Sequence, residues 1–229
     1  MIVMEQKPLN EIMGMLGGFN SLLIVGCNGC AGIYQVGGEK QAEVMKMLIE
    51  MARRIGGGEE MNTKATTVLR QCDLQIVSTS IAPLVEDYDA ILSMACGVGV
   101  QTLAQAFEDK TIVPANNTKF MGMQERELGK LYEMCSACGD CILFETGGVC
   151  PVTRCAKGMM NGPCGGCVGG KCEVPYEVRD ESGKVVEAVE KDCAWYLIYE
   201  RLKGEGRLAS FRRYRPPRNR ATSTSPRLL

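Results

Sequence analysis

The chain has 229 residues, of which 45% are hydrophobic and 23% are charged, as is usual for a globular protein with one large or two small domains. Its formal net charge of −1 gives it no general attraction to nucleic acid or to a membrane surface. It contains 13 cysteines and no histidine. Histidine, the commonest acid–base catalyst, is therefore missing, and we expect no catalytic residue in this chain. Any zinc site must be built from thiolates, with or without carboxylates.

The cysteines indicate metal binding rather than disulfide bonds. The first residues lack the basic and apolar regions of a secretion signal, and no run of about 18 apolar residues is present to cross a bilayer. We therefore expect a cytoplasmic protein without membrane insertion. Structural disulfides are rare in that reducing compartment, so they are the minority interpretation.

Residues 1–125 are predicted to form a small Rossmann-like α/β domain. Its expected strands are residues 21–25, 65–69, 89–95 and 111–114, with a helix as the alternative for 65–69. Its expected helices are residues 39–54 and 98–107. The first helix is indicated by Val44, Met47, Leu48 and Met51, which recur at roughly i, i+3, i+4 and i+7. Alternation of strands and helices predicts a parallel sheet with helices on its faces.

Residues 126–203 are predicted to form a cysteine-rich iron–sulfur domain. Helices are expected at residues 124–134 and 194–202, the second with Trp195, Ile198, Tyr199 and Leu202 on one face. Because this region has few apolar residues, a metal centre must supply much of its stability.

A basic tail is predicted over residues 204–229. Its arginines are Arg207, Arg212, Arg213, Arg215, Arg218, Arg220 and Arg227. The tail is interpreted either as a disordered terminus or as an arm that binds an acidic partner surface.

Four cysteines come after the first three predicted strands. They are Cys27, Cys30, Cys72 and Cys96. Because the carboxyl ends of parallel strands share the edge where such folds bind ligands, we expect these thiolates to converge on one metal site. Four thiolates suit an iron–sulfur cluster or a zinc ion. The alternatives are a thioredoxin-like redox motif at the Cys27–Cys30 pair alone, or buried thiols without a function.

Nine further cysteines allow two more four-cysteine sites and one spare thiol. Eight are predicted metal ligands: Cys135, Cys138, Cys141, Cys150, Cys155, Cys164, Cys172 and Cys193. The run 135–141 followed by Cys150-Pro151 is similar to the ligand run of bacterial ferredoxins, with a longer gap. Cys167, in the glycine-rich stretch 165–170, is selected as the spare thiol. A zinc ribbon is the alternative, although it would use only four of the nine.

Several long motifs carry a resemblance to a known family. They are CSACGDC at 135–141, TGGVCPVTRCAKG at 146–158, NGPCGG at 161–166, GKCE at 170–173 and CAW at 193–195, together with DAIL at 89–92 and ACGVGVQ at 95–101. The sequence resembles the methylenetetrahydrofolate reductase C-terminal domain family over most of residues 20–203. Cys167 is not part of the family pattern.

The resemblance implies a non-catalytic subunit of an oxidoreductase complex in one-carbon metabolism, as in the Wood–Ljungdahl pathway of acetogenic bacteria. It implies two or three 4Fe-4S clusters, with zinc as an option at one site. The partners implied are a flavin-containing methylenetetrahydrofolate reductase catalytic subunit, which would carry the flavin, and a ferredoxin or another electron-donor protein. The alternative is a structural zinc or iron–sulfur module that anchors the catalytic subunit without carrying electrons.

Overall fold

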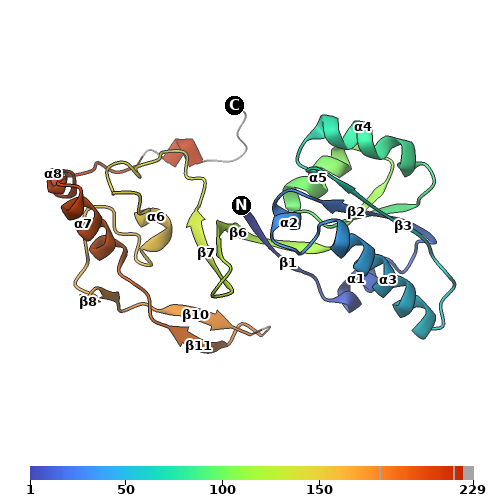
Figure 1. The fold of residues 1–229 in the computed structure, drawn as a ribbon, viewed down its shortest axis with the longest axis horizontal. Helices are drawn as coiled ribbons and strands as arrows, with labels where there is room; N and C mark the ends of the chain where they lie inside the picture. The colour runs from blue at the N-terminus through green and yellow to red at the C-terminus, as the bar shows by residue number, and fades with distance from the viewer. Residues whose placement is uncertain (181, 219, 224–229) are drawn as a thin grey trace. The chain divides into compact units, whose positions relative to one another are not determined.

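The computed structural model describes residues 1–180, 182–218 and 220–223 (Figure 1). The chain forms two compact units, Met1–Gly122 and Met123–Leu229. Each unit has its own cluster of buried apolar residues. Among the described helices, none is both long enough and apolar enough to cross a membrane.

A four-stranded parallel sheet forms the centre of the first unit, as the sequence predicts. In spatial order its strands are β3 (Asn62–Val68), β2 (Ser21–Cys27), β4 (Ala90–Ser93) and β5 (Thr111–Pro114). The segment for which a helix was the alternative is therefore a strand, β3.

Helices cover both faces of this sheet (Figure 1). They are α1 (Leu9–Met15), α3 (Glu39–Ile55), α4 (Leu74–Val85) and α5 (Gly97–Ala106), and the short α2 (Cys30–Ile33) follows β2. Alternate residues of a strand face opposite sides. Leu22 and Ile24 of β2 accordingly pack in one cluster with α1 and α3, whereas Leu23 and Val25 pack in another with α4 and α5. The prediction of an α/β unit with a parallel sheet is confirmed.

Helix α3 buries a different face from the apolar stripe that indicated the helix in the sequence. Its buried residues are Ala42, Met45 and Ile49, whereas Val44, Met47 and Met51 are exposed and Leu48 is only partly buried. Both stripes have apolar residues at helical spacing, so periodicity did not distinguish them. The stripe that contains the small Ala42 is the one that packs against the sheet.

The buried face of α3 predicts a large loss of stability for one substitution on this helix and almost none for another. Ile49→Ala is expected to lower the free energy of unfolding by about 2–5 kcal/mol, because it leaves a cavity against the sheet. Met51→Ala is expected to change it by less than about 0.5 kcal/mol, because that side chain is 57% exposed. Urea denaturation of the two variants tests the assignment, and equal losses would restore the face that the sequence favoured.

A pair of antiparallel strands completes the first unit. β1 (Ile2–Gln6) pairs with β6 (Asn116–Glu125), with Ile2 opposite Met121 and Gln6 opposite Asn116. β6 continues past Gly122 into the second unit.

The helix predicted over residues 124–134 is wrong. The chain leaves β6, turns, and returns as β7 (Lys130–Cys135). Leu128, Leu131 and Tyr132 have helical spacing, which explains the prediction. Gly129, however, has a φ of +62°, a left-handed conformation that glycine adopts freely and that ends any helix there.

The rest of the second unit consists of short elements around a small core. They are α6 (Pro151–Arg154), β8 (Cys167–Val168), β9 (Lys171–Cys172), β10 (Tyr176–Arg179), β11 (Val185–Val189), α7 (Ala194–Gly204), α8 (Leu208–Arg212) and the 3-10 turn η1 (Arg220–Ser223). The predicted helix at 194–202 is confirmed as α7. Its residues Trp195, Ile198 and Leu202 are buried together, whereas Tyr199 is only partly buried.

The described part of the basic tail binds to the second unit itself. The Arg207 guanidinium donates to the carbonyl of Phe144 at 2.6 Å. Arg215 and Asn161 exchange two hydrogen bonds, from Arg215 N to Asn161 Oδ1 at 2.7 Å and from Asn161 Nδ2 to Arg215 O at 3.0 Å. Arg227 lies outside the described residues. The guanidinium groups of Arg207, Arg215 and Arg218 thus donate to backbone carbonyls of the cysteine-rich region.

Candidate metal centre

The edge of the parallel sheet has a switch point between β2 and β4. These strands are neighbours, but the helix α3 that follows β2 covers one face and the helix α5 that follows β4 covers the other. The two connections therefore diverge and leave room at the carboxyl ends of the strands, where open α/β sheets bind ligands. Cys27 and Cys30 lie on the β2 side and Cys96 lies on the β4 side.

The first cysteine set, which consists of Cys27, Cys30, Cys72 and Cys96, lies around Cys27. Cys27 is the last residue of β2 and is buried, Cys30 begins α2, and Cys96 is the N-cap of α5. These three cysteines pack in one apolar cluster with Met4, Ile2, Ala31, Val36 and Ala95. Cys72, which is exposed, lies in the loop between β3 and α4, close enough to Cys27 to influence its ionisation.

Opposing influences act on the pKa of the Cys27 thiol. Burial raises its pKa, and the nearby thiols of Cys72 and Cys96 add to that effect. The backbone N–H groups of Gln71 and Gly29 donate to the sulfur and oppose the shift. Such N–H···S hydrogen bonds are also the contacts that stabilise a metal-bound thiolate.

Gln71 holds the two central strands together next to these cysteines. Its fully buried side chain donates to the carbonyls of Val25 at 2.7 Å and Gly26 at 3.1 Å, and its Oε1 accepts a 2.6 Å hydrogen bond from the Ser93 hydroxyl. The amide thus connects the end of β2 with the end of β4. Sequence reasoning missed this residue, although its position directly before Cys72 in a loop was a signal.

Four cysteines of the second unit gather in its core. Cys155, Cys167, Cys172 and Cys193 pack in one cluster with Val149 and Trp195. Burial first, and then the neighbouring thiol of Cys193, raise the pKa of the Cys167 thiol. Cys167, which the sequence prediction left as a spare thiol, therefore has two other cysteines beside it, since Cys172 lies directly opposite it across the β8–β9 pair.

The remaining cysteines of this unit lie outside that cluster. Cys135 ends β7, Cys138 and Cys141 lie on the irregular loop that follows, Cys150 is the N-cap of α6, and Cys164 is partly buried. The backbone N–H of Ala137 donates to the Cys135 sulfur at 3.4 Å.

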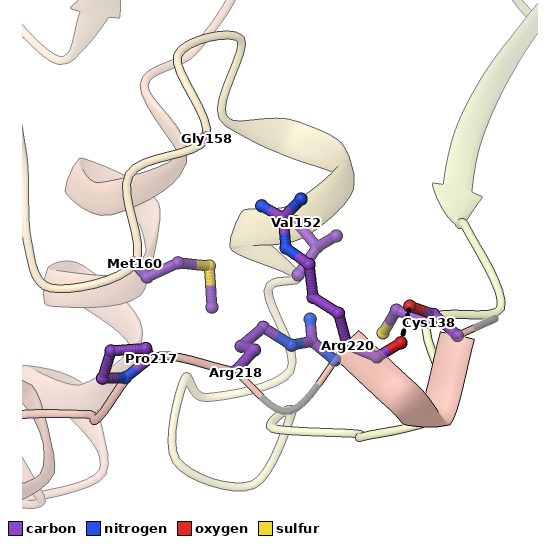
Figure 2. Close-up of a pocket in the computed structure, with 8 residues that line it drawn as sticks. Cys138, Val152, Gly158, Met160, Pro217, Arg218 and Arg220 are labelled. Atoms are coloured by element: carbon purple, nitrogen blue, oxygen red, sulfur yellow. Dashed lines mark hydrogen bonds between the residues drawn. The ribbon is translucent and has the colours of Figure 1, made fainter.

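Cys138 lies beside a basic cavity of about 500 Å³ (Figure 2). The cavity is lined by Cys138, Val152, Gly158, Met160, Pro217, Arg218, Arg220 and Ser223. The Arg218 guanidinium donates to the backbone carbonyl of Asp140 at 2.8 Å. Hydrogen bonding with the backbone of Asp140 is the largest influence on the Cys138 thiol and lowers its pKa. Burial opposes this effect, and the guanidinium of Arg218 lowers the pKa further.

The donor set suits soft metal centres, although the side chains are not arranged as a finished site. Among the residues that the structure describes, no three Cys, Asp or Glu side chains are grouped closely enough to hold a metal ion as they stand. The chemistry of the donors nevertheless fits iron–sulfur clusters and zinc, because both are bound by thiolates. The contacts around Cys27 and around Cys167 identify the two places where several thiols already lie together.

Fold and cysteine groups together define a two-unit protein, with a parallel α/β unit and a cysteine-rich unit. Residues 113–221 match the family model described as methylene-tetrahydrofolate reductase C terminal, and this part of the chain belongs to that family. The family that the sequence motifs indicated is thereby confirmed. No curated protein matches the chain.

One solved structure is similar to part of the chain. It is an extracellular ligand-binding receptor from Verminephrobacter eiseniae, at 12% identity and a TM-score of 0.33. The similarity covers 46% of this chain and 28% of that chain. A similarity this low supports no conclusion about fold or function.

Proposed function

We propose that this chain is the electron-transfer subunit of a methylenetetrahydrofolate reductase complex. In this proposal its cysteines bind iron–sulfur clusters, and electrons pass from a ferredoxin or a similar donor to the flavin of a catalytic partner subunit in the cytoplasm. A domain of this family fits a complex with a catalytic reductase subunit. The observation that carries the proposal is the packing of Cys27, Cys30 and Cys96 in one cluster, with Cys72 near Cys27, at the edge of the parallel sheet.

The residues around Cys27 have separate tasks in this proposal. Cys27, Cys30, Cys72 and Cys96 would bind a 4Fe-4S cluster, which when bound takes up and releases one electron at a time. The N–H groups of Gln71 and Gly29 would donate to the Cys27 sulfur and stabilise its thiolate form. Met4, Ala31 and Ala95 are buried beside the thiols and exclude water from one side of the site.

The proposal is tested first by the metal content of the intact complex. The chain is purified anaerobically with its catalytic subunit, and iron, acid-labile sulfide and zinc are measured. We expect about four irons for each cluster, and reduction of the partner's flavin after addition of a reduced ferredoxin. Fewer than about four irons per chain would eliminate the electron-transfer role and favour the structural module.

Cys96→Ser is expected to remove the cluster at the sheet edge. The variant should lose about four irons per chain and one component of the electron paramagnetic resonance spectrum, because a serine hydroxyl is a poor replacement for a thiolate. Val98→Ser is the matched control, since this residue is on the same helix and 55% exposed, and it should keep its iron. Unchanged iron in Cys96→Ser would show that the four cysteines do not form one site.

A structural role remains the second candidate, and a specific observation favours it for the second unit. Cys155, Cys167, Cys172 and Cys193 are packed against the buried residues of α7 rather than at an open edge. A metal bound there would hold the fold of the unit together. The two candidates can therefore both be true, each for a different group of cysteines.

A further inference from the structure

We propose that a cavity in the second unit binds a small organic carboxylate through Lys191 and Arg154. The inference depends neither on electron transfer nor on a bound metal. It concerns two cations that have no role in the proposed function and that line the same cavity.

The cavity has a volume of about 270 Å³, and β7, α6, β9, β10 and α7 each contribute to its wall. One part of the wall is charged and includes Lys191 and Arg154. The remaining part is apolar or aromatic and consists of Met123, Tyr132, Tyr176 and Leu197. Sites for small organic molecules commonly have this composition, in which a few polar groups orient a ligand against apolar walls.

Lys191 is a buried lysine without a counter-ion. The residue is only 7% exposed, although its ammonium has three N–H groups to satisfy. The ammonium lies 5.2 Å from the centre of the Tyr176 ring, which lines the same cavity, so the charge faces the cavity. Within the described residues, no acidic side chain forms an ion pair with Lys191 and no oxygen accepts a hydrogen bond from its ammonium. Attraction to a tyrosine ring is weaker than the cost of removing an ammonium from water, so this lysine favours an external anion.

Two of the carboxylates around the cavity are already paired with a different lysine. The Lys171 ammonium lies 2.7 Å from Asp192 Oδ1 and 4.0 Å from Glu190 Oε2. These two carboxylates therefore meet one cation at the rim, where all three side chains are half exposed or more. They do not neutralise Lys191.

Arg154 is the second cation that has no acidic partner in the described part of the chain. Its guanidinium makes only a long contact, 4.0 Å, with the Met134 sulfur. The remaining carboxylate among the residues placed around the cavity is Glu125, which lies beside Tyr132: burial first, and then Glu125, raise the pKa of that phenol. Two cations thus face one carboxylate, and a singly charged anion would balance them.

The aromatic part of the wall indicates what the anion carries besides its charge. Tyr132 and Tyr176 meet edge-to-face with ring centroids 6.4 Å apart, and Met123 and Leu197 add apolar surface. A carboxylate attached to a ring or a short apolar chain would use both parts of the cavity. A bare inorganic ion would leave the apolar part in contact with water.

The test is calorimetric titration of benzoate into the full chain, purified anaerobically. We expect benzoate to bind, and its neutral analogue benzamide to bind at least about tenfold more weakly, because benzamide brings no charge to the two cations. Lys191→Met keeps the length of the side chain and removes the charge, and it should weaken benzoate binding by about tenfold or more. Lys130→Met, at an exposed lysine of β7 that does not line the cavity, is the control with unchanged affinity.

Three outcomes would overturn the inference: no binding of benzoate, equal affinity for benzamide, or equal affinity in Lys191→Met. The titration contains neither an electron donor nor a catalytic subunit. Its failure would therefore leave the proposed function untouched, and failure of electron transfer would not count against the cavity.

A second measurement uses the wild-type chain in case Lys191→Met does not fold. Lysines are acetylated with the sulfonated N-hydroxysuccinimide ester of acetic acid, with and without benzoate, and the modified residues are located by mass spectrometry. We expect benzoate to slow the modification of Lys191 and to leave that of the exposed Lys184 unchanged. Modification of Lys191 at the same rate with benzoate would contradict the inference. So would a Lys191 that never reacts, because a cavity open to an organic carboxylate must also admit this small anionic reagent.

Discussion

Gly37→Ala is expected to destabilise the first unit by about 3 kcal/mol or more. A Cβ atom at Gly37 would lie 1.9 Å from the carbonyl oxygen of Met94 and 2.9 Å from its carbonyl carbon. Both atoms belong to the backbone, so rotation of a side chain cannot relieve these contacts. One of the two backbone segments has to move.

Movement of either segment would disturb the edge that carries the first cysteine set. The Met94 carbonyl accepts from Asn116 Nδ2 at 2.7 Å, and the Met94 N–H donates to the carbonyl of Val25 at 2.9 Å. On the other side of the contact, the Gly37 carbonyl accepts a 2.7 Å hydrogen bond from the N–H of Cys27. We therefore expect Gly37→Ala to lose metal from the Cys27 site even at temperatures where the unit stays folded.

Peptide-resolved hydrogen exchange measures the effect where it is expected. Amides of β2 and β4 should exchange faster in Gly37→Ala, because the free energy of opening falls with the stability of the unit. Gly18→Ala is the control, since a Cβ there has no neighbour within 4 Å and should change stability by less than about 0.5 kcal/mol. Equal protection of β2 in the two variants would mean that the backbone at Gly37 shifts without a loss of stability, which would contradict the prediction.

The parallel sheet could be predicted because its signal is local. Strand β2 is buried on both faces, so its sequence is a continuous apolar run rather than an alternating one, and the glycine-punctuated segments that follow it fit a βαβ connection. The position of Cys27, Cys72 and Cys96 after successive strands then required only the rule that ligands bind at carboxyl ends.

The remaining features depend on contacts between distant segments. The buried face of α3 is decided by which stripe fits the sheet, and two apolar stripes compete in the sequence. The grouping of Cys167 with Cys193 depends on the β8–β9 hairpin. The sequence Gly169-Gly170 indicates a tight turn, but it does not indicate that the hairpin packs beside α7. The contact of Arg218 with Asp140 joins residues 78 positions apart, and no periodicity encodes it.

Trp195→Ala is expected to lower the stability of the second unit by about 3–5 kcal/mol, because a large side chain at 1% exposure leaves a cavity in a small core. Trp195 packs edge-to-face on Phe211 with ring centroids 5.9 Å apart, and its Nε1–H donates to the carbonyl of Met159 at 2.9 Å. The substitution therefore removes apolar contacts and leaves a carbonyl without its donor.

The same tryptophan connects two of the segments that carry the core cysteines of the second unit. Met159 lies four residues after Cys155, and Trp195 lies two residues after Cys193, so the indole hydrogen bond fixes one thiol relative to the other. Trp195→Ala should consequently lose any metal bound by these cysteines at a lower chelator concentration than the wild type. Trp195→Phe keeps much of the packing but loses the donor, and we expect an intermediate result.

Hydrogen exchange distinguishes a local effect on the second unit from general unfolding. In Trp195→Ala, amides of α7 should lose protection while those of β2, in the first unit, keep theirs. Tyr214→Ala, at an aromatic residue that is 73% exposed, is the control and should change stability by less than about 0.5 kcal/mol. Protection of α7 that survives the loss of Trp195 would show that the bound metal, rather than the apolar core, holds this unit together.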